Sequence, residues 1–133
     1  MTRASGSFEV KLTPQKPDNS EATSANVGRM SISKQFHGDL EATSRGEMLS
    51  VMTDVEGSAG YVAMERVSGT VGGKTGTFAL QHSATMNRGA PSLSISVVPD
   101  STGELIGLSG TITIRFEPGK HFYDFEYTFP AKS

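Results

Sequence analysis

Glu65 and His82 are the two side chains whose chemistry the sequence brings together most directly. Tyr61 to Val71 has the length of a β-strand, Lys74 to Met86 forms a second, and Gly72-Gly73 between them is a two-residue hairpin signal. If this turn closes the hairpin, Glu65 and His82 lie on the same face, one residue pair apart. A carboxylate and an imidazole on an otherwise apolar face could act as a general acid–base pair, or as a polar anchor for a ligand.

The register of this hairpin decides which residues share a face. Its predicted ladder pairs Val71 with Lys74, Val67 with Phe78, Glu65 with Leu80, Ala63 with His82 and Tyr61 with Ala84, so that apolar positions mostly meet apolar positions. Two other interpretations stay open. Glu65 and His82 could be a buried pair with a purely structural role, or a slip of one residue could turn Glu65 outward.

The rest of the chain predicts further strands and one long polar loop. Residues 14–27, PQKPDNSEATSANV, contain no large side chain that could anchor a core and indicate a loop or lid. A Pro118-Gly119 turn favours a type II geometry, which predicts a bulge between the last two strands. With the central hairpin, the predicted strands are Ser7–Thr13, Arg29–Phe36, Leu40–Met52, Tyr61–Val71, Lys74–Met86, Ser92–Val98, Leu108–Glu117 and Lys120–Phe129.

About eight antiparallel strands joined by short turns favour an all-β fold. A meander barrel removes exposed sheet edges, and a barrel of eight strands encloses a lumen that side chains fill or that holds one small ligand. We therefore predict one antiparallel β-barrel domain over residues 1–133.

Composition excludes several classes of function. The 12 basic and 14 acidic residues give a net charge of −2, and without a basic run nothing favours nucleic acid. The absence of cysteine excludes disulfides and thiolate chemistry. Because the N-terminus lacks the apolar core of a signal peptide and no segment is long enough for a membrane span, we expect a cytoplasmic protein without a membrane partner.

Two further patterns could indicate a nucleotide site or a metal site, and neither fits. The segment from Ser68 to Thr75 is similar to a phosphate-binding loop, but its first glycine is missing and a strand follows where a helix is needed, so we reject nucleotide binding. His37, His82 and His121 lack metal-ligand spacing, and we expect neither a metal nor another cofactor.

Several segments together resemble a known family. They are FHGDLEATSRGEM, GSAGYVAMERVSGTVGGKTGTFALQHSATMNRGAPSLSISVVP, TGELIGLSGTITI and GKHFYDFEYTF. Their order resembles a bacterial domain-of-unknown-function family, DUF3224, over Phe8 to Phe129. That family resembles in fold the allene oxide cyclase-like barrels, which include the dirigent proteins. The resemblance implies a lumen for apolar or phenolic molecules, and it transfers no catalytic residue.

We therefore predict a barrel that binds a small hydrophobic or aromatic molecule. One alternative is a cofactor-independent isomerase or cyclase that uses Glu65 and His82. The other is a filled barrel that serves as an assembly module, a dimer or trimer formed through Leu49, Val51, Val62 and Met64. The predicted ligand-binding residues are Tyr61, Phe78, Met86, His121, Tyr123 and Phe125.

Overall fold

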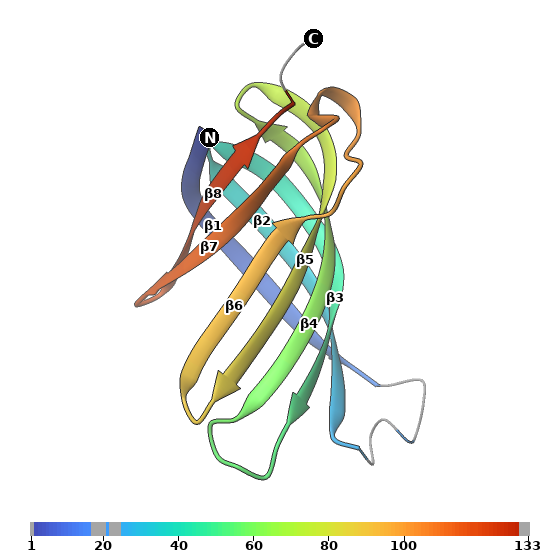
Figure 1. The fold of residues 1–133 in the computed structure, drawn as a ribbon, viewed down its shortest axis with the longest axis vertical. Coiled ribbons are helices and arrows are strands. Elements are labelled where there is room, and N and C mark those ends of the chain that lie inside the picture. Colours follow the sequence, from blue (N-terminus) through green and yellow to red (C-terminus); the bar gives the residue numbers. More distant parts are fainter. Residues whose placement is uncertain (1, 17–20, 22–24, 131–133) are drawn as a thin grey trace.

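The chain folds as a closed antiparallel barrel of eight strands in sequential order, which confirms the predicted meander (Figure 1). The computed structural model describes residues 2–16, 21 and 25–130. Its elements are β1 (Thr2–Gln15), β2 (Val27–Gly38), β3 (Leu40–Met52), β4 (Ala59–Val71), β5 (Lys74–Asn87), β6 (Ala90–Val97), the 3-10 turn η1 (Gly103–Leu105), β7 (Ser109–Glu117) and β8 (Lys120–Thr128). Among these residues, no helix is long and apolar enough to cross a membrane.

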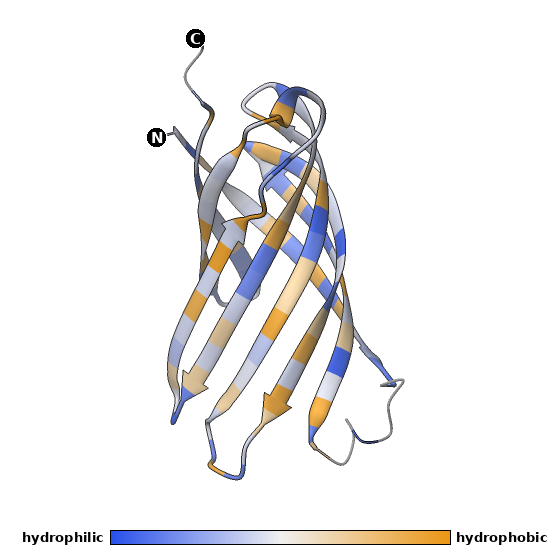
Figure 2. Cartoon of the chain, turned by 45° about the vertical axis from the view of Figure 1, so that its right-hand side comes forward, coloured by the Kyte–Doolittle hydropathy of each residue, from blue (hydrophilic) through white to orange (hydrophobic). Residues whose placement is uncertain are grey.

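The strands form because apolar and polar residues alternate along them, so that one face of each strand turns into the lumen (Figure 2). The central hairpin has the predicted register from Tyr61↔Ala84 to Val71↔Lys74. Its turn residues Gly72 and Gly73 both have positive φ, at 58° and 79°, which glycine adopts without strain. Glu65 and His82 therefore face inward, and the slipped register is wrong.

The structure differs from the prediction at the first strand and at the Pro118-Gly119 turn. The first strand is longer than predicted at both ends, and Pro14 and Gln15 pair with β2 instead of starting the loop. Half of the predicted loop, residues 17–20 and 22–24, lies outside the described residues. The expected bulge at Pro118-Gly119 is absent, because the pairs Glu117↔Lys120 and Phe116↔His121 run on without an extra residue.

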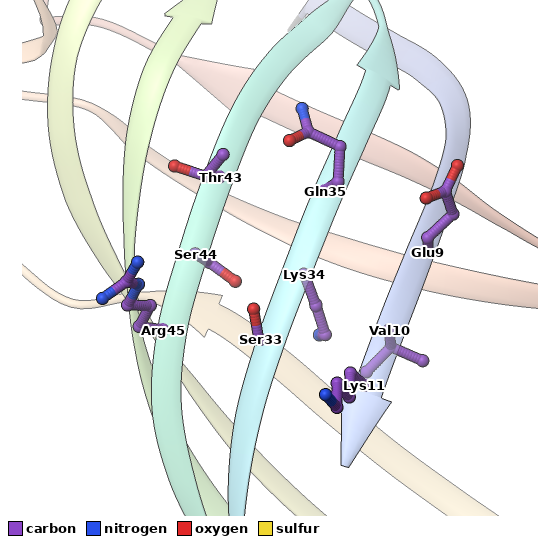
Figure 3. A pocket seen from close by; sticks show the side chains of 9 residues that line it. All are labelled: Glu9, Val10, Lys11, Ser33, Lys34, Gln35, Thr43, Ser44 and Arg45. Atoms are coloured by element: carbon purple, nitrogen blue, oxygen red, sulfur yellow. The ribbon is translucent and has the colours of Figure 1, made fainter.

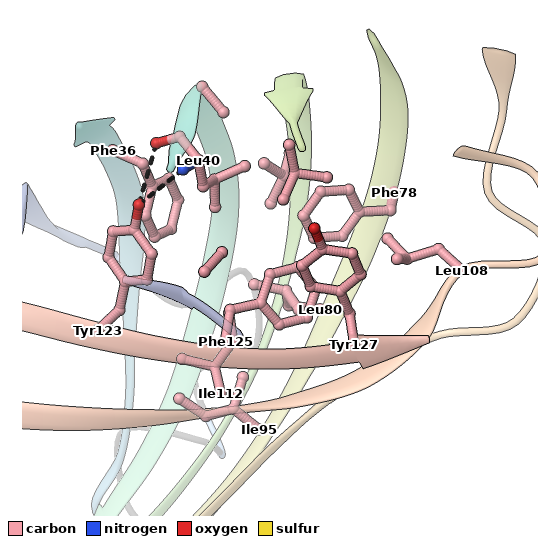
Figure 4. Packing of buried hydrophobic residues seen from close by; sticks show 14 of the residues in the cluster. Phe36, Leu40, Phe78, Leu80, Ile95, Leu108, Ile112, Tyr123, Phe125 and Tyr127 are labelled. Atoms are coloured by element: carbon pink, nitrogen blue, oxygen red, sulfur yellow. Dashed lines mark hydrogen bonds between the residues drawn. The ribbon is translucent and has the colours of Figure 1, made fainter. Parts of the chain in front are cut away.

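Large side chains fill the upper half of the lumen. Tyr123, Phe125 and Phe78 are almost fully buried there (Figure 4), and Leu105 from η1 is fully buried in the same core cluster. The Tyr123 hydroxyl accepts a hydrogen bond from the Leu40 backbone nitrogen at 2.9 Å, which ties β8 to the start of β3 across the barrel. This half of the barrel is a packed core.

The lower half is more open because β6 and β7 separate. They share one register pair, Ser96↔Thr111, whereas β5 and β6 share a ladder from Leu80↔Val97 to Asn87↔Ala90. Below that pair the two strands diverge, and the β7–β8 hairpin projects to one side (Figure 1). The barrel is therefore closed at its upper end and splayed at its lower end.

Candidate functional site

Glu65 is the centre of a buried polar cluster inside the barrel. Its side chain is inaccessible to solvent, and its carboxylate receives partners from three other strands. Lys34 Nζ on β2 lies 2.9 Å from Oε2, and His82 Nε2 on β5 lies 2.8 Å from the same oxygen. Ser44 Oγ on β3 donates to Oε1 at 3.1 Å. Both carboxylate oxygens are thus satisfied, as a buried charge requires.

A glycine makes room for this carboxylate. Gly46 on β3 lies directly opposite Glu65, and a Cβ at that position would overlap the Met64 carbonyl oxygen. Because β3 carries no side chain there, the Glu65 carboxylate can reach Ser44, the next inward residue of β3. Glycine at position 46 is thus part of the site.

Lys34 supplies the buried positive charge. Its side chain is 8% exposed, and its ammonium lies 5.3 Å from the centre of the Phe8 ring and 5.8 Å from that of Phe36. Aromatic faces attract a cation, so these rings stabilise the ammonium on the side away from Glu65. The ion pair is largely withdrawn from water, and removing either partner would leave the other as an uncompensated buried charge.

The cluster keeps Glu65 ionised. Burial alone would raise the pKa of Glu65, but the hydrogen bond from His82 and the charge and hydrogen bond of Lys34 outweigh it, so the pKa lies below its usual range. A carboxylate that is held ionised and bonded to an imidazole can exchange a proton with it. This is the chemistry that the cluster offers.

Little free space adjoins the cluster. A cavity of about 10 Å³ lies beside Lys34 and His82, walled by Phe8, Phe36, Leu80, Ile95, Ile112, Ile114 and Tyr123. One water molecule needs about this volume, so nothing larger than a water fits there.

A larger cavity, the lower funnel, occupies the splayed end of the barrel. Its volume is about 370 Å³. It is lined by Met48, Ser50, Met52, Ala59, Gly60, Tyr61, Ala84, Thr85, Met86, Pro91, Ser92, Leu93 and Phe116. Small inward side chains help to leave this space, since β4 and β5 carry Ala59 and Ala84 at positions that line the funnel. The lining is apolar except for a few hydroxyl groups.

Tyr61 connects the lower funnel with the polar cluster. Burial and the negative charge of Glu65 both raise the pKa of Tyr61, so its hydroxyl stays protonated at neutral pH. No group in the described part of the chain makes a hydrogen bond with that hydroxyl. The Tyr61 hydroxyl therefore offers a ligand an uncommitted hydrogen-bonding group on a mainly apolar wall.

Comparison with known proteins places the chain in a family. The family model described as "Protein of unknown function (DUF3224)" matches residues 4–127. The chain belongs to the DUF3224 family. It is similar to the crystal structure of a DUF3224 protein with unknown function from Shewanella oneidensis MR-1, with 49% sequence identity, 99% of each chain covered and a TM-score of 0.92. The comparison with curated proteins found no match.

In this DUF3224 barrel, the predicted ligand-binding residues lie in three different places. Tyr61 and Met86 line the lower funnel. Phe78, Tyr123 and Phe125 lie in the packed upper core (Figure 4), with exposures of 1% or less. His121 lies lower on β8, in contact with the tilted ring of Phe8 at 5.3 Å and edge-on to Phe116 at 5.0 Å between ring centres. Of the predicted ligand-binding residues, Tyr61 and Met86 line the lower funnel and adjoin its open volume.

The three histidines lie in three different environments. His82 belongs to the buried cluster, whereas His37 is exposed beside Glu9 and Glu41 at the turn between β2 and β3. His121 is enclosed by aromatic rings. Across residues 2–16, 21 and 25–130, no group of three or more histidine and acidic side chains has the arrangement of a metal site.

Sequence reasoning missed Lys34 and Ser44. Both share the inward parity of their strands, Lys34 with Ile32 and Phe36, and Ser44 with Leu40 and Ala42. A charged residue at an inward position is a signal for a buried partner. The alternation of β2 could therefore have indicated that Lys34 points inward to a buried partner.

Proposed function

We propose that this barrel binds a small apolar or aromatic molecule in the lower funnel. The observation that carries the proposal is the funnel itself, about 370 Å³ of open volume on the lumen side of the strands. Ligand pockets have volumes of roughly 300–1,000 Å³ and combine apolar walls with a few polar groups. The volume, the mainly apolar lining and the uncommitted Tyr61 hydroxyl all fit that description.

The rim of the lower funnel supports the same class of ligand. Large apolar side chains around it stay in contact with water, with Phe116 70%, Met52 64% and Met86 43% exposed. Exposed apolar side chains that gather around one cavity are typical of a binding site. Methionine side chains are flexible and polarizable, so this rim can adapt to a flat aromatic ligand. A ligand with one hydrogen-bonding oxygen would also satisfy Tyr61.

The test blocks the lower funnel from inside and compares the result with a matched change on the outside. Ala84 lines the funnel, whereas Ser83, its neighbour on β5, is exposed on the outer face. We expect Ala84→Trp to abolish the saturable fluorescence increase of the neutral probe N-phenylnaphthylamine, because an indole fills the cavity. Ser83→Trp should bind the probe as the wild type does. Binding that survives Ala84→Trp in a variant with native circular dichroism would contradict the proposal.

A second candidate is a cofactor-independent isomerase or cyclase that uses Glu65 and His82. The 2.8 Å hydrogen bond between them and the ionised state of Glu65 favour it. Neither residue lines the lower funnel, so a substrate would have to reach them past Tyr61. This candidate predicts that Glu65→Gln abolishes turnover of a funnel ligand while its affinity stays unchanged. Unchanged turnover would exclude Glu65 from the chemistry.

The alternative of an assembly module is supported by an exposed apolar patch on the outer face of the barrel. Leu49, Val51, Val62 and Met64 are between 39% and 53% exposed on the outer face of β3 and β4, where Leu49 pairs directly with Val62. This apolar patch supports a dimer or trimer, and Val62→Asp should then give a monomer in light scattering. The resemblance in fold to the allene oxide cyclase-like barrels and the cytoplasmic location both stay predictions.

A further inference from the structure

We propose that the outer wall of the barrel carries a binding site for a phosphate group, held between Arg45 on β3 and Arg66 on β4. The two arginines lie directly opposite each other in the ladder between these strands. The register continues from Arg45 to Ser33 on β2 and from Ser33 to Lys11 on β1. Three cationic residues therefore lie in one row across four neighbouring strands, on the face that points away from the lumen.

The row is unusual because its charges lack acidic partners. The other arginines on strands each have one, Arg3 with Glu126 at 2.7 Å, Arg115 with Asp124 at 2.9 Å, and Arg29 with Glu47. In the described part of the chain, neither Arg45 nor Arg66 nor Lys11 makes an ion pair or a side-chain hydrogen bond. Like charges directly opposite each other in a sheet are destabilising, so this arrangement favours an anion that neutralises them.

Uncommitted hydroxyl groups complete the site. Thr43 and Ser68 are opposite each other in the same ladder, two residues along from Arg45 and Arg66. Their side chains make no hydrogen bond to any described group. The Cβ atoms of the two arginines and of the two hydroxyl residues thus lie at the corners of a rectangle about 5 Å by 7 Å, as the strand geometry sets it. Guanidinium groups bind phosphate oxygens in pairs, and hydroxyls donate to the remaining oxygens.

The wall beside Arg45 is also hollowed. A trough of about 450 Å³ is lined by three consecutive residues from each of three strands, namely 9–11, 33–35 and 43–45. Figure 3 shows Glu9, Gln35 and Thr43 in one row across the three strands and Lys11, Ser33 and Arg45 in a second row. Lys34 and Ser44 turn inward to Glu65, so their backbone forms part of the floor. The trough gives room for the organic part of a phosphate monoester.

The nearest acidic side chains do not oppose an anion here. Glu47 follows Arg45 by two residues on β3 and is already paired with Arg29. Glu9, at the far end of the trough, lies 3.4 Å from His37. The charge at the centre of the site is therefore positive, although the net charge of the chain is −2.

The test is a titration of the full chain, ¹⁵N-labelled, with inorganic phosphate at constant ionic strength set by chloride. We expect saturable shifts of the Arg45 and Arg66 Nε–Hε signals and of the Thr43 and Ser68 amides. Arg45→Gln and Arg66→Gln should each weaken binding about tenfold or more, since each removes charge-assisted hydrogen bonds. Arg88→Gln, which removes the same charge from the turn between β5 and β6, should bind phosphate as the wild type does.

Two further arms separate the possible sources of the phosphate. Phenyl phosphate that binds more tightly than inorganic phosphate, with added shifts at Gln35 and Ser33, identifies a monoester whose carbon part lies in the trough. Equal affinity identifies the free ion. The proposal would be overturned by shifts that grow linearly and spread over all arginine and lysine signals. It would also be overturned if the double variant Arg45→Gln, Arg66→Gln kept native circular dichroism and still bound phosphate.

Discussion

Replacing Lys34 by methionine tests the buried cluster most severely, because the change removes the ammonium and keeps the length of the side chain. Lys34 is 8% exposed, and Glu65 lies completely out of contact with solvent. Breaking a buried ion pair costs about 3–5 kcal/mol. Glu65 keeps its bonds to His82 and Ser44 in this variant, so we expect the low end, about 3 kcal/mol of the free energy of unfolding. That is a large part of the roughly 5–15 kcal/mol that stabilises a typical domain.

The loss should depend on pH. Without the ammonium, the charge and the hydrogen bond of Lys34 no longer lower the pKa of Glu65, whereas burial, the largest cause, still raises it. The folded pKa of Glu65 is therefore higher in the variant than in the wild type, and a protonated, neutral Glu65 leaves no uncompensated charge inside the barrel. A rise in the folded pKa stabilises the fold at low pH, and the effect disappears as the pH rises. We therefore expect the variant to lose less stability at about pH 5.5 than at about pH 8.

Urea unfolding followed by circular dichroism and tyrosine fluorescence measures these differences. The double variant Lys34→Met, Glu65→Gln should recover more than half of the loss, since no charge is then left uncompensated. Lys120→Met, at an exposed position on β8, is the matched control and should change stability by less than about 0.5 kcal/mol. A cost below about 1 kcal/mol for Lys34→Met, which is the value of an exposed ion pair, would refute the reasoning.

Two further predictions concern the scaffold around the site. Burial, the largest cause, raises the pKa of Tyr123 to about 12. The contribution of Tyr123 to stability is therefore complete below its unfolded pKa of about 10 and is lost between about pH 10 and 12. In alkaline titrations Tyr123→Phe should lose less stability over that window than the wild type, and equal losses would contradict this. Gly46→Ala should destabilise the barrel by more than about 3 kcal/mol in urea unfolding, because the added Cβ overlaps β4. Gly89→Ala should cost less despite its positive φ, because no atom lies within 4 Å of the added Cβ.

The central hairpin shows how much of the fold is accessible from sequence. A two-residue glycine turn leaves one register, and that register by itself places Glu65 and His82 on one face. Lys34 is harder to place, since β2 is not adjacent to β4 in the sheet and the two residues meet across the lumen only because the barrel curves. Alternation can indicate that Lys34 points inward, but it cannot identify its partner.

The lower funnel depends on features that periodicity does not encode. The positions of Ala59 and Ala84 at the lower ends of β4 and β5 are visible in the sequence, and they predict open space. The separation of β6 from β7 is not visible, because it follows from how the segment from Val98 to Leu108 packs against β5. The unbroken register at Pro118-Gly119 likewise shows that turn preference alone is a weak guide to a bulge.

The central claim is that the lower funnel holds a small apolar ligand, and the methyl groups of methionine report on it directly. Met48, Met52 and Met86 line the funnel, whereas Met64 lies on the outer face of β4. In a titration of ¹³C-methyl-labelled protein with naphthalene, the claim predicts saturable shifts of the three funnel signals and an unchanged Met64 signal. Unchanged funnel signals, or shifts largest at Met64, would place the binding surface outside the barrel and contradict the claim.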